Sequence, residues 1–238
     1  MIEELPPVIT IDGPGGSGKG TVGQRLAWKF GWEFLDSGAL YRLVGLSALK
    51  KSLDLTDITV ISNLARNLDA QFAVKEGEQG AESIILLEDE NVSAQLRTEK
   101  CAQAASQIAQ ISDVRDALLE RQRAFRVTPG LVADGRDMGT VVFADAQLKI
   151  FLTASAEIRA ERRFKQLKDK VSGVSLSAIL AEIQERDDRD TNRSVSPLVP
   201  ASDAVILDTT EMSVDDVEKK ALQLAKDVFR EEITSNIK

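Results

Sequence analysis

The segment that decides the fold is VITIDGPGGSGKGT, which runs from Val8 to Thr21. Its first part, Val8 to Ile11, is rich in β-branched residues and predicts a buried strand. A glycine-rich turn follows, and from Lys19 to Phe30 the apolar residues recur at helical spacing. A strand, a glycine-rich turn and a helix form the context of a phosphate-binding loop, because glycines let successive N–H groups surround an anion. The sequence therefore predicts that a nucleotide phosphate binds here.

This loop departs from the common pattern at one position. That pattern has Ser or Thr directly after Gly-Lys, whereas this chain has Gly20 there and its hydroxyl at Thr21. Gly-Lys-Gly-Thr resembles the loop of nucleoside-monophosphate kinases, and it leaves direct metal ligation by Thr21 open. The alternative interpretation is a glycine-rich turn that binds no ligand. The residues that we expect to bind nucleotide phosphates are Gly13, Pro14, Gly15, Gly16, Ser17, Gly18, Lys19, Gly20 and Thr21.

Short apolar strands alternate with amphipathic helices along most of the chain. After the first strand and helix, the pattern predicts strands at 32–35, 130–134, 148–152 and 204–207. It predicts helices at 38–50, 57–67, 99–111, 113–127, 157–168, 175–193 and 214–231. This alternation indicates an α/β fold in which helices flank a central parallel sheet.

One stretch interrupts the alternation. Residues 70–74 and 83–88 have the pattern of two strands, and the acidic, glycine-containing segment 76–80 separates them. This arrangement predicts a small β-containing insertion at about 68–97. Because the chain has no internal repeat and no long linker, we expect residues 1–238 to form a single domain that carries this insertion.

The composition excludes several kinds of site. The chain has 238 residues and no histidine, which excludes a Ser-His-Asp triad, a Cys-His pair and a His-ligated metal. Its single cysteine, Cys101, excludes an intramolecular disulfide, and we interpret it as a packing residue on an alanine-rich helix. With 30 Lys and Arg residues against 38 Asp and Glu residues, the net charge of −8 argues against broad nucleic-acid binding. The N-terminus lacks a signal-peptide pattern and no apolar run could span a bilayer, so we expect a cytoplasmic protein without membrane contact.

The helix expected at 175–193 carries an apolar stripe that becomes charged toward its end. At about 100° per residue, one face contains Leu176, Ile179, Leu180, Ile183, Arg186, Arg189, Asp190 and Arg193. Charges that face a core are costly unless they are paired or bind a ligand. We therefore interpret this helix end as entering a cleft where guanidinium groups meet phosphate or ribose. The alternative is a solvated helix end that is ion-paired with Asp187 and Asp188.

Two polar loops follow predicted strands. Residues 134–140 read DGRDMGT, and residues 36–42 read DSGALYR. Open α/β sheets bind ligands at the carboxyl ends of their strands, so both loops are candidates for binding. Asp134 is also positioned to hold a metal-bound water. The alternatives are an ordinary strand-to-helix loop at 134–140, a helix cap at Ser37 and a surface position for Arg42.

Together, these segments resemble bacterial cytidylate kinase over nearly the whole chain. The resemblance rests on residues 13–21, 36–42, 104–107, 121–123, 133–140 and 185–190. It implies a P-loop kinase core and an enzyme of pyrimidine metabolism that transfers the γ-phosphate of ATP to CMP or dCMP, assisted by Mg²⁺. It also implies that the 68–97 insertion binds the nucleoside monophosphate and that the segment 155–170 is a short mobile lid. We accordingly expect a monomer whose partners are small nucleotides and not nucleic acids.

The resemblance further implies roles for individual residues. The P-loop would bind the ATP phosphates, and the catalytic cations would be Lys19, Arg136, Arg186 and Arg193. The residues that would bind CMP are Ser37, Arg42, Ser106, Arg115, Asp137, Arg186, Asp190 and Arg193. Within that set, Ser106, Arg115 and Asp137 would read the cytosine. Arg186 and Asp190 would reach the sugar. Arg42 and Arg136 would hold phosphate, with Arg193 nearby. The lid would contribute Arg159, Arg162 and Arg163, and the loop 208–210 would lie near adenine. Thr21 or Asp134 would hold the metal through water. We interpret Trp28, Trp32 and Met138 as core or packing residues.

This chemistry agrees with the absence of histidine. The second pKa of a phosphate monoester is about 6, so the acceptor oxygen is already largely ionised near pH 7 and no base has to deprotonate it. Two other hypotheses stay open on the residues alone. A kinase that phosphorylates a hydroxyl would need a base such as Asp36 or Asp134. A non-catalytic module would bind ATP without transferring phosphate to any acceptor.

Overall fold

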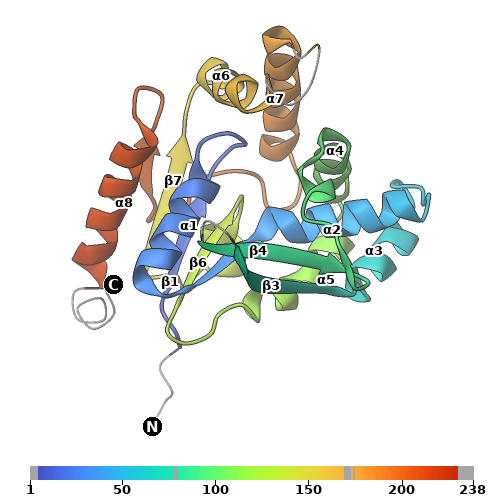
Figure 1. The fold of residues 1–238 in the computed structure, drawn as a ribbon, viewed down its shortest axis with the longest axis horizontal. Helices are drawn as coiled ribbons and strands as arrows, with labels where there is room; N and C mark the ends of the chain where they lie inside the picture. The colour runs from blue at the N-terminus through green and yellow to red at the C-terminus, as the bar shows by residue number, and fades with distance from the viewer. Residues whose placement is uncertain (1–4, 78–79, 169–172, 174, 230–238) are drawn as a thin grey trace. The chain divides into compact units, whose positions relative to one another are not determined.

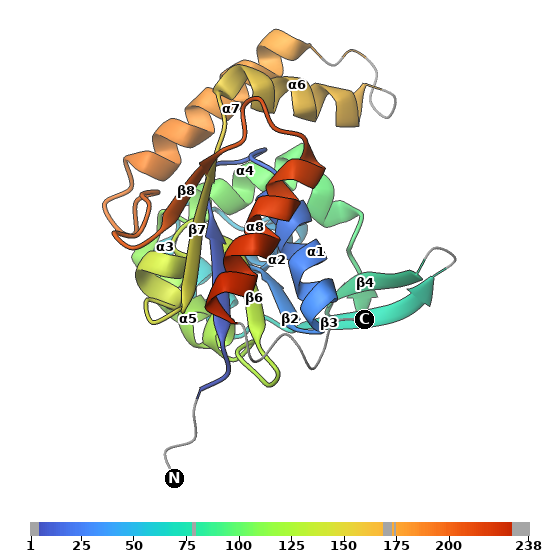
Figure 2. The same ribbon diagram turned by 90° about the vertical axis from the view of Figure 1, so that its left-hand side faces the viewer.

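The computed structural model describes residues 5–77, 80–168, 173 and 175–229. The chain forms two compact units, of which the first combines Met1–Asp36 with Gln122–Lys238 and the second is Ser37–Arg121. Figures 1 and 2 show the elements of both units. The insertion predicted at 68–97 falls within the second unit, and its residues 78–79 lie outside the described residues.

The first unit is built around a five-stranded sheet in which all strand pairs are parallel. The strand order is β2 (Glu33–Asp36), β6 (Leu131–Gly135), β1 (Val8–Asp12), β7 (Leu148–Thr153) and β8 (Val205–Asp208). The predicted α/β fold with a central parallel sheet is therefore confirmed. The register places Asp134 of β6 beside Ile11 of β1 and Asp36 of β2. The carboxyl ends of β1, β2 and β6 consequently bring their acidic residues to one edge of the sheet.

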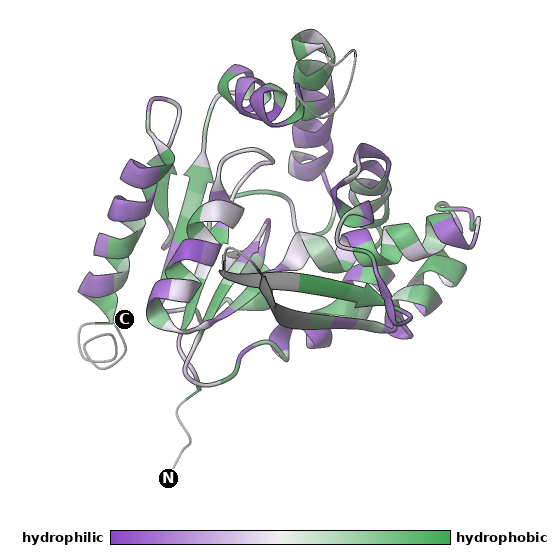
Figure 3. Cartoon of the chain, viewed as in Figure 1, coloured by the Kyte–Doolittle hydropathy of each residue, from purple (hydrophilic) through white to green (hydrophobic). Residues whose placement is uncertain are grey.

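Helices α1 (Lys19–Phe30) and α8 (Val214–Val228) pack side by side on this sheet (Figures 1 and 2). The strands are largely hydrophobic, whereas α8 alternates hydrophobic and hydrophilic residues (Figure 3). Val22, Leu26 and Phe30 of α1 enter the core, as their four-residue spacing predicts. Trp28 lies about 200° around the helix from Leu26 and is 75% exposed, so its prediction as a packing residue was wrong.

The remaining core contacts explain how α1 ends. Gly31 adopts a left-handed conformation, with φ of 64°, and terminates the helix. The chain then turns so that the Trp32 ring packs 5.5 Å from Phe30 and 5.2 Å from Phe229, centroid to centroid. A Cβ at Gly130 would lie 2.5 Å from the Trp32 ring, so this contact requires glycine. Met138 is also buried, and the predicted packing roles of Trp32 and Met138 are confirmed.

Two further helices of the first unit, α6 (Ala156–Leu167) and α7 (Leu176–Thr191), lie against each other (Figure 2). A short π-helical turn, Met138–Val142, follows β6. The stripe predicted on α7 is buried at Ile179 and again at Asp190, but Leu176 at its beginning is 43% exposed. The end of the predicted lid at 169–170 and the end of the helix predicted at 214–231 fall outside the described residues.

The second unit contains helices and a small antiparallel sheet. Its helices are α2 (Ser37–Lys50), α3 (Ile58–Arg66), the short 3₁₀ turn Gln95–Arg97, α4 (Glu99–Ile108) and most of α5 (Ser112–Arg123). The sheet has the order β3 (Ala70–Gly77), β4 (Gly80–Leu87) and β5 (Glu90–Asn91), which confirms the predicted pair of strands. Cys101 is buried in α4, and its Sγ donates to the Arg42 carbonyl at 3.3 Å, which agrees with a packing role. Among the described residues, no helix is both long and apolar enough to cross a membrane.

Candidate functional site

The glycine-rich loop connects the carboxyl end of β1 to the first turn of α1. Gly13 approaches β7 so closely that a Cβ there would lie 2.0 Å from the Leu152 carbonyl oxygen. Ser17 is buried, and no described residue hydrogen-bonds to its Oγ. Backbone N–H groups in such a loop, at the positive end of a helix, provide donors for an anion. The structure thus places the predicted phosphate-binding loop in the required strand-to-helix context.

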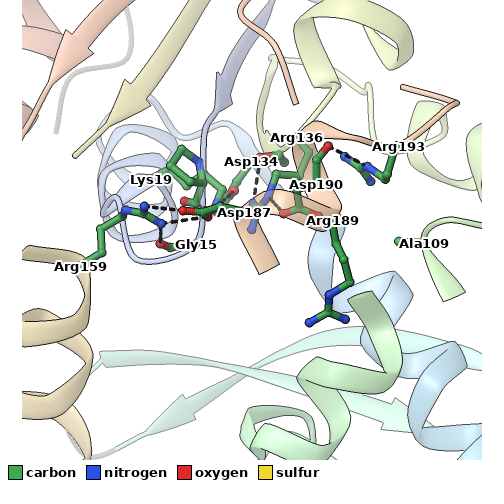
Figure 4. Close-up of polar contacts among 12 residues, drawn as sticks. Gly15, Lys19, Ala109, Asp134, Arg136, Arg159, Asp187, Arg189, Asp190 and Arg193 are labelled. Atoms are coloured by element: carbon green, nitrogen blue, oxygen red, sulfur yellow. Dashed lines mark hydrogen bonds and ion pairs between the residues drawn. The ribbon is translucent and has the colours of Figure 1, made fainter. Parts of the chain in front are cut away.

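Lys19 lies at the base of this loop, with 11% of its side chain exposed. Its Nζ is 3.4 Å from the Pro14 carbonyl oxygen and 3.7 Å from Asp134 Oδ1 (Figure 4). Burial, together with the neighbouring Arg136, lowers the pKa of Lys19 to about 8, while Asp134 opposes this shift. An arriving phosphate would add negative charge and favour the ammonium form. Lys19 is therefore positioned to gain more from a bound anion than an exposed lysine would.

The glycine at position 20 makes room for Asp134. A Cβ on Gly20 would lie 3.0 Å from Asp134 Oδ2, so the Ser or Thr of the common loop would crowd this carboxylate. Asp134 is buried on β6, whereas Thr21 is exposed on the first turn of α1. The described residues contain no group of three or more Asp, Glu, His or Cys that could hold a metal by itself. One carboxylate beside a phosphate-binding loop nevertheless fits Mg²⁺, which is commonly held by one or two carboxylates, water and substrate phosphates.

Arg136 and Asp190 form a buried ion pair next to the loop. Arg136 Nε donates to Asp190 Oδ2 at 2.7 Å (Figure 4). Burial on its own would raise the pKa of Asp190, but Arg136, Arg186 and Arg193 outweigh it and hold that pKa below its usual value. Arg193 is buried, and its Nε donates to the Asp190 carbonyl at 3.2 Å. The charged end of the α7 stripe is therefore a packed electrostatic cluster rather than a solvated helix end.

Arg136 and Arg186 also border the P-loop. A Cβ on Gly15 would lie 3.6 Å from Arg136 Nη2 and 3.9 Å from Arg186 Nη1. Arg189, which the helical count places on the same stripe, contacts its own helix, where its Nε donates to the Glu185 carbonyl at 3.4 Å. Its guanidinium also lies 3.8 Å from Glu185 Oε1, and 28% of the side chain is exposed. The structure thus brings together, beside the P-loop, three predicted site residues that lie on α7 or just after it: Arg186, Asp190 and Arg193.

Two arginines of the predicted lid, Arg159 and Arg162, are engaged by backbone oxygens and by polar side chains. Arg159 is buried and donates from Nε to the Ala154 carbonyl at 2.9 Å and from Nη1 to the Gly15 carbonyl at 3.1 Å. It also pairs with Asp187, which is therefore not the solvated helix-end partner considered above. Arg162 donates to both the Thr209 carbonyl and Thr209 Oγ1. In this structure, Arg159 and Arg162 brace the P-loop and the 208–210 loop, and Arg163 is half-buried on α6.

The second unit holds four of the predicted CMP-binding residues. Arg115 is buried, lies 5.7 Å from the centroid of the Tyr41 ring, and donates to the Ala109 carbonyl at 3.3 Å. Ser106 is 5% exposed, and no described residue hydrogen-bonds to its Oγ. The other two are Ser37, buried at the start of α2, and Arg42, half-buried on the same helix. Tyr41 was not predicted as a site residue, and no local signal identified it, because its cation–π partner Arg115 is 74 positions away in the sequence.

Asp12, the last residue of β1, was also missed. Its carboxylate accepts hydrogen bonds from the Met138 N–H at 2.9 Å and the Gly139 N–H at 2.8 Å. The adjacent Asp137, a predicted cytosine reader, is itself buried. A carboxylate that ends an otherwise apolar strand, directly before the glycine loop, was the available signal in the sequence.

Comparison with known proteins shows the family of this chain. The family model described as Cytidylate kinase matches residues 9–227. The cytidylate kinase of Pseudomonas fluorescens (strain Pf0-1) is 57% identical over 216 residues, which cover 91% of this chain and 93% of that protein. The cytidylate kinase of Photorhabdus laumondii subsp. laumondii is 54% identical over 225 residues, covering 94% and 97%. That of Shewanella frigidimarina (strain NCIMB 400) is 53% identical over 222 residues, covering 93% and 96%. This chain belongs to the cytidylate kinase family.

Proposed function

We propose that this chain is a (d)CMP kinase, which transfers the γ-phosphate of ATP to CMP or dCMP and releases ADP with CDP or dCDP. The observation that carries the proposal is the group of cations beside the P-loop. Lys19 stands within the loop, and the guanidinium groups of Arg136 and Arg186 lie beside Gly15. A protein that only held one nucleotide would have little use for arginines beyond the loop, whereas a kinase must bring two phosphorylated molecules together.

The residues act by binding and by stabilising charge. Phosphoryl transfer spreads negative charge over the equatorial oxygens of the moving group, and positioned cations stabilise that charge. Lys19 and the loop N–H groups bind the donor phosphates, and Arg136, Arg186 and Arg193 stabilise the transferring and accepting groups. The acceptor phosphate is already largely ionised, so no side chain has to remove a proton. Asp134 accordingly needs no role as a base.

We assign Mg²⁺ to the carboxylate edge of the sheet. Asp134 would hold it, directly or through water, with Thr21 as the alternative oxygen ligand. When bound, Mg²⁺ would neutralise charge on the phosphates. The space at Gly20 supports Asp134, because any side chain at that position would displace its carboxylate.

The acceptor nucleotide requires further contacts. We propose that Ser106, Arg115 and Asp137 read the cytosine; the buried Ser106 Oγ, which no described residue satisfies, supports a ligand contact there. Arg42 would bind the acceptor phosphate and Asp190 would bind the sugar. Ser37, at the start of α2, would also contact CMP. The segment 68–97 would act as the monophosphate-binding insertion and 155–170 as the lid. Residues 208–210 would lie near adenine, and the enzyme would act as a monomer.

A coupled ADP-release assay with CMP, dCMP, UMP, AMP and GMP tests the proposal. We expect the highest kcat/KM with CMP or dCMP, whose monophosphate group, and not a hydroxyl, accepts the γ-phosphate. Turnover of another acceptor without turnover of CMP or dCMP would contradict the proposal. ATP binding without phosphate transfer to any of the five would contradict it as well.

A further inference from the structure

Asp12 has no part in the proposed chemistry, yet it is 5% exposed at the centre of the sheet edge. Both of its carboxylate oxygens are used. Oδ1 accepts from the Met138 N–H at 2.9 Å, and Oδ2 accepts from the Gly139 N–H at 2.8 Å. These contacts join the last residue of β1 to the loop that follows β6. The residue after Asp12 is Gly13, the first residue of the P-loop, so this carboxylate connects two ligand-binding loops.

The two donors are at the start of the π-helical turn Met138–Val142. The first N–H groups of a helical turn have no partner within the turn, and a carboxylate satisfies them well. The turn is also supported from below, because a Cβ on Gly139 would lie 2.8 Å from Thr10 Oγ1 and 3.2 Å from Lys149 Cδ. Close packing therefore prevents the loop from moving toward the sheet, and the Asp12 carboxylate prevents it from moving away.

This arrangement is electrostatically unfavourable. Burial raises the pKa of Asp12 to about 7, with the two backbone hydrogen bonds opposing this shift and the neighbouring Asp137 and Asp134 carboxylates adding to it. Arg136 is a cation close enough to Asp12 for their charges to attract, and this attraction raises the pKa of Arg136. A neutral side chain would avoid the repulsion that the ionised carboxylate meets above about pH 7, so the presence of an acid at this position needs a reason. The reason that the geometry offers is the position of the Arg136–Asp137 segment, which Met138 directly follows.

We propose that Asp12 is a positioning residue that fixes the Arg136–Asp137 segment against the P-loop, and so aims both side chains at the acceptor nucleotide. The proposal rests on the proposed function, because it assigns these two side chains to the acceptor. Asp12 acts through the backbone of Met138 and Gly139 and does not touch the substrate. Its two oxygens are both engaged and buried, which leaves it poorly placed as a general base.

The test is the variant Asp12→Asn, assayed at pH 8 with CMP and UMP as acceptors. An amide keeps one acceptor oxygen but turns an NH₂ group toward the second backbone donor. We expect KM for CMP to rise about tenfold, and the ratio of kcat/KM for CMP to that for UMP to fall about fivefold, as for the loss of a charge-assisted hydrogen bond. KM for ATP should stay within about twofold, because the carboxylate does not bind the P-loop backbone. Amide hydrogen exchange at Met138 and Gly139 should accelerate.

Two control variants separate positioning from general destabilisation. Asp145→Asn removes an exposed carboxylate of the same unit, and Ile150→Val loosens the core under the sheet. Neither should change the CMP-to-UMP ratio. Asp12→Ser, which keeps one acceptor and adds no NH₂ group, replaces Asp12→Asn if the latter does not fold. An unchanged ratio and unchanged exchange in a folded Asp12 variant would overturn the proposal, as would an equal fall in the ratio in the controls. If the wild-type protein does not phosphorylate CMP, the proposed function fails, while the exchange measurement still tests the contact.

Discussion

Replacing Asp190 with Asn should destabilise the protein while leaving its shape nearly unchanged. In the wild type, Arg136 Nε donates to Asp190 Oδ2 at 2.7 Å, and both side chains are largely buried. Asn can still accept this hydrogen bond through its amide oxygen, but the negative charge is lost. Arg136 then loses its ionic partner, and Arg186 and Arg193 lose a stabilising negative charge. The variant therefore isolates the charge of Asp190 from its size.

The magnitude follows from the burial of the pair. Removing one member of a buried ion pair typically costs about 3–5 kcal/mol, and the retained hydrogen bond places this variant near the lower value, about 3 kcal/mol. For a chain of this length, a loss of that size lowers Tm by about 6–12 °C. Asp188→Asn is the matched control, because Asp188 is exposed on the same helix. We expect the control to change stability by less than about 0.5 kcal/mol.

The lowered pKa of Asp190 also predicts how the stability difference between wild type and variant changes with pH. The pKa of Asp190 is lower in the folded protein than its ordinary value of 3.8, so the unfolded chain binds its proton first as the pH falls. The stabilisation is therefore complete well above pH 3.8 and disappears as the pH drops through the folded-state pKa. Urea unfolding of wild type and Asp190→Asn should show the full difference at pH 7 and a smaller one near pH 3.5. Equal stability at pH 7, or a difference independent of pH, would refute the charge argument.

Three further predictions concern the carboxyl end of β1 and the P-loop that follows it. Lys19→Ala should lower kcat by about 10²–10³, because it removes a positioned charge, and near-normal steady-state kcat would contradict that role. Gly20→Ala should push Asp134 aside, since its Cβ would lie 3.0 Å from Oδ2. The Mg²⁺ concentration for half-maximal rate should then rise about tenfold, whereas an unchanged Mg²⁺ titration would remove Asp134 from the metal site. For Asp12, the folded state keeps its proton up to about pH 7 while the unfolded chain releases it near 3.8. As the pH rises through this window, the free energy of unfolding of the wild type should therefore fall by about 4 kcal/mol relative to that of Asp12→Asn, as measured by urea unfolding. Parallel pH profiles of the two proteins would contradict the raised pKa.

The fold was predictable because its signals are local and repeated. Strands β1 and β6 are buried on both faces, so they appear in the sequence as continuous apolar runs, and each is followed by a glycine-containing polar loop. The four-residue spacing of Val22, Leu26 and Phe30 likewise identified the buried face of α1. Trp28 was expected to be a packing residue, but it lies on the opposite side of this helix from Leu26 and is exposed, so that expectation was wrong.

The sequence allowed several residues of the site to be predicted, but not which of them form ion pairs and hydrogen bonds with one another. Motifs identified Lys19, Arg136 and Asp190, whose chemistry is specific, but no local pattern tells which carboxylate a given arginine will meet. The Arg159–Asp187 pair joins residues 28 positions apart, and the hydrogen bonds of Asp12 span 126 and 127 positions. Such contacts depend on the register of strands and on the direction of long side chains, both of which are set by the assembled sheet.

These pairings explain how a chain with a net charge of −8 can bind polyanions. Beside the P-loop, Lys19 lies near Asp134 and Arg136 is bonded to Asp190. Burying either cation without its carboxylate would be costly, so the acids make it possible to hold the cations in place before any nucleotide arrives. Because these cations are already oriented, little reorganisation is needed when charge develops on the transferring group. The two members of a pair should consequently respond differently to removal. Loss of the acid should appear first in the free energy of unfolding, and loss of the cation should appear first in kcat.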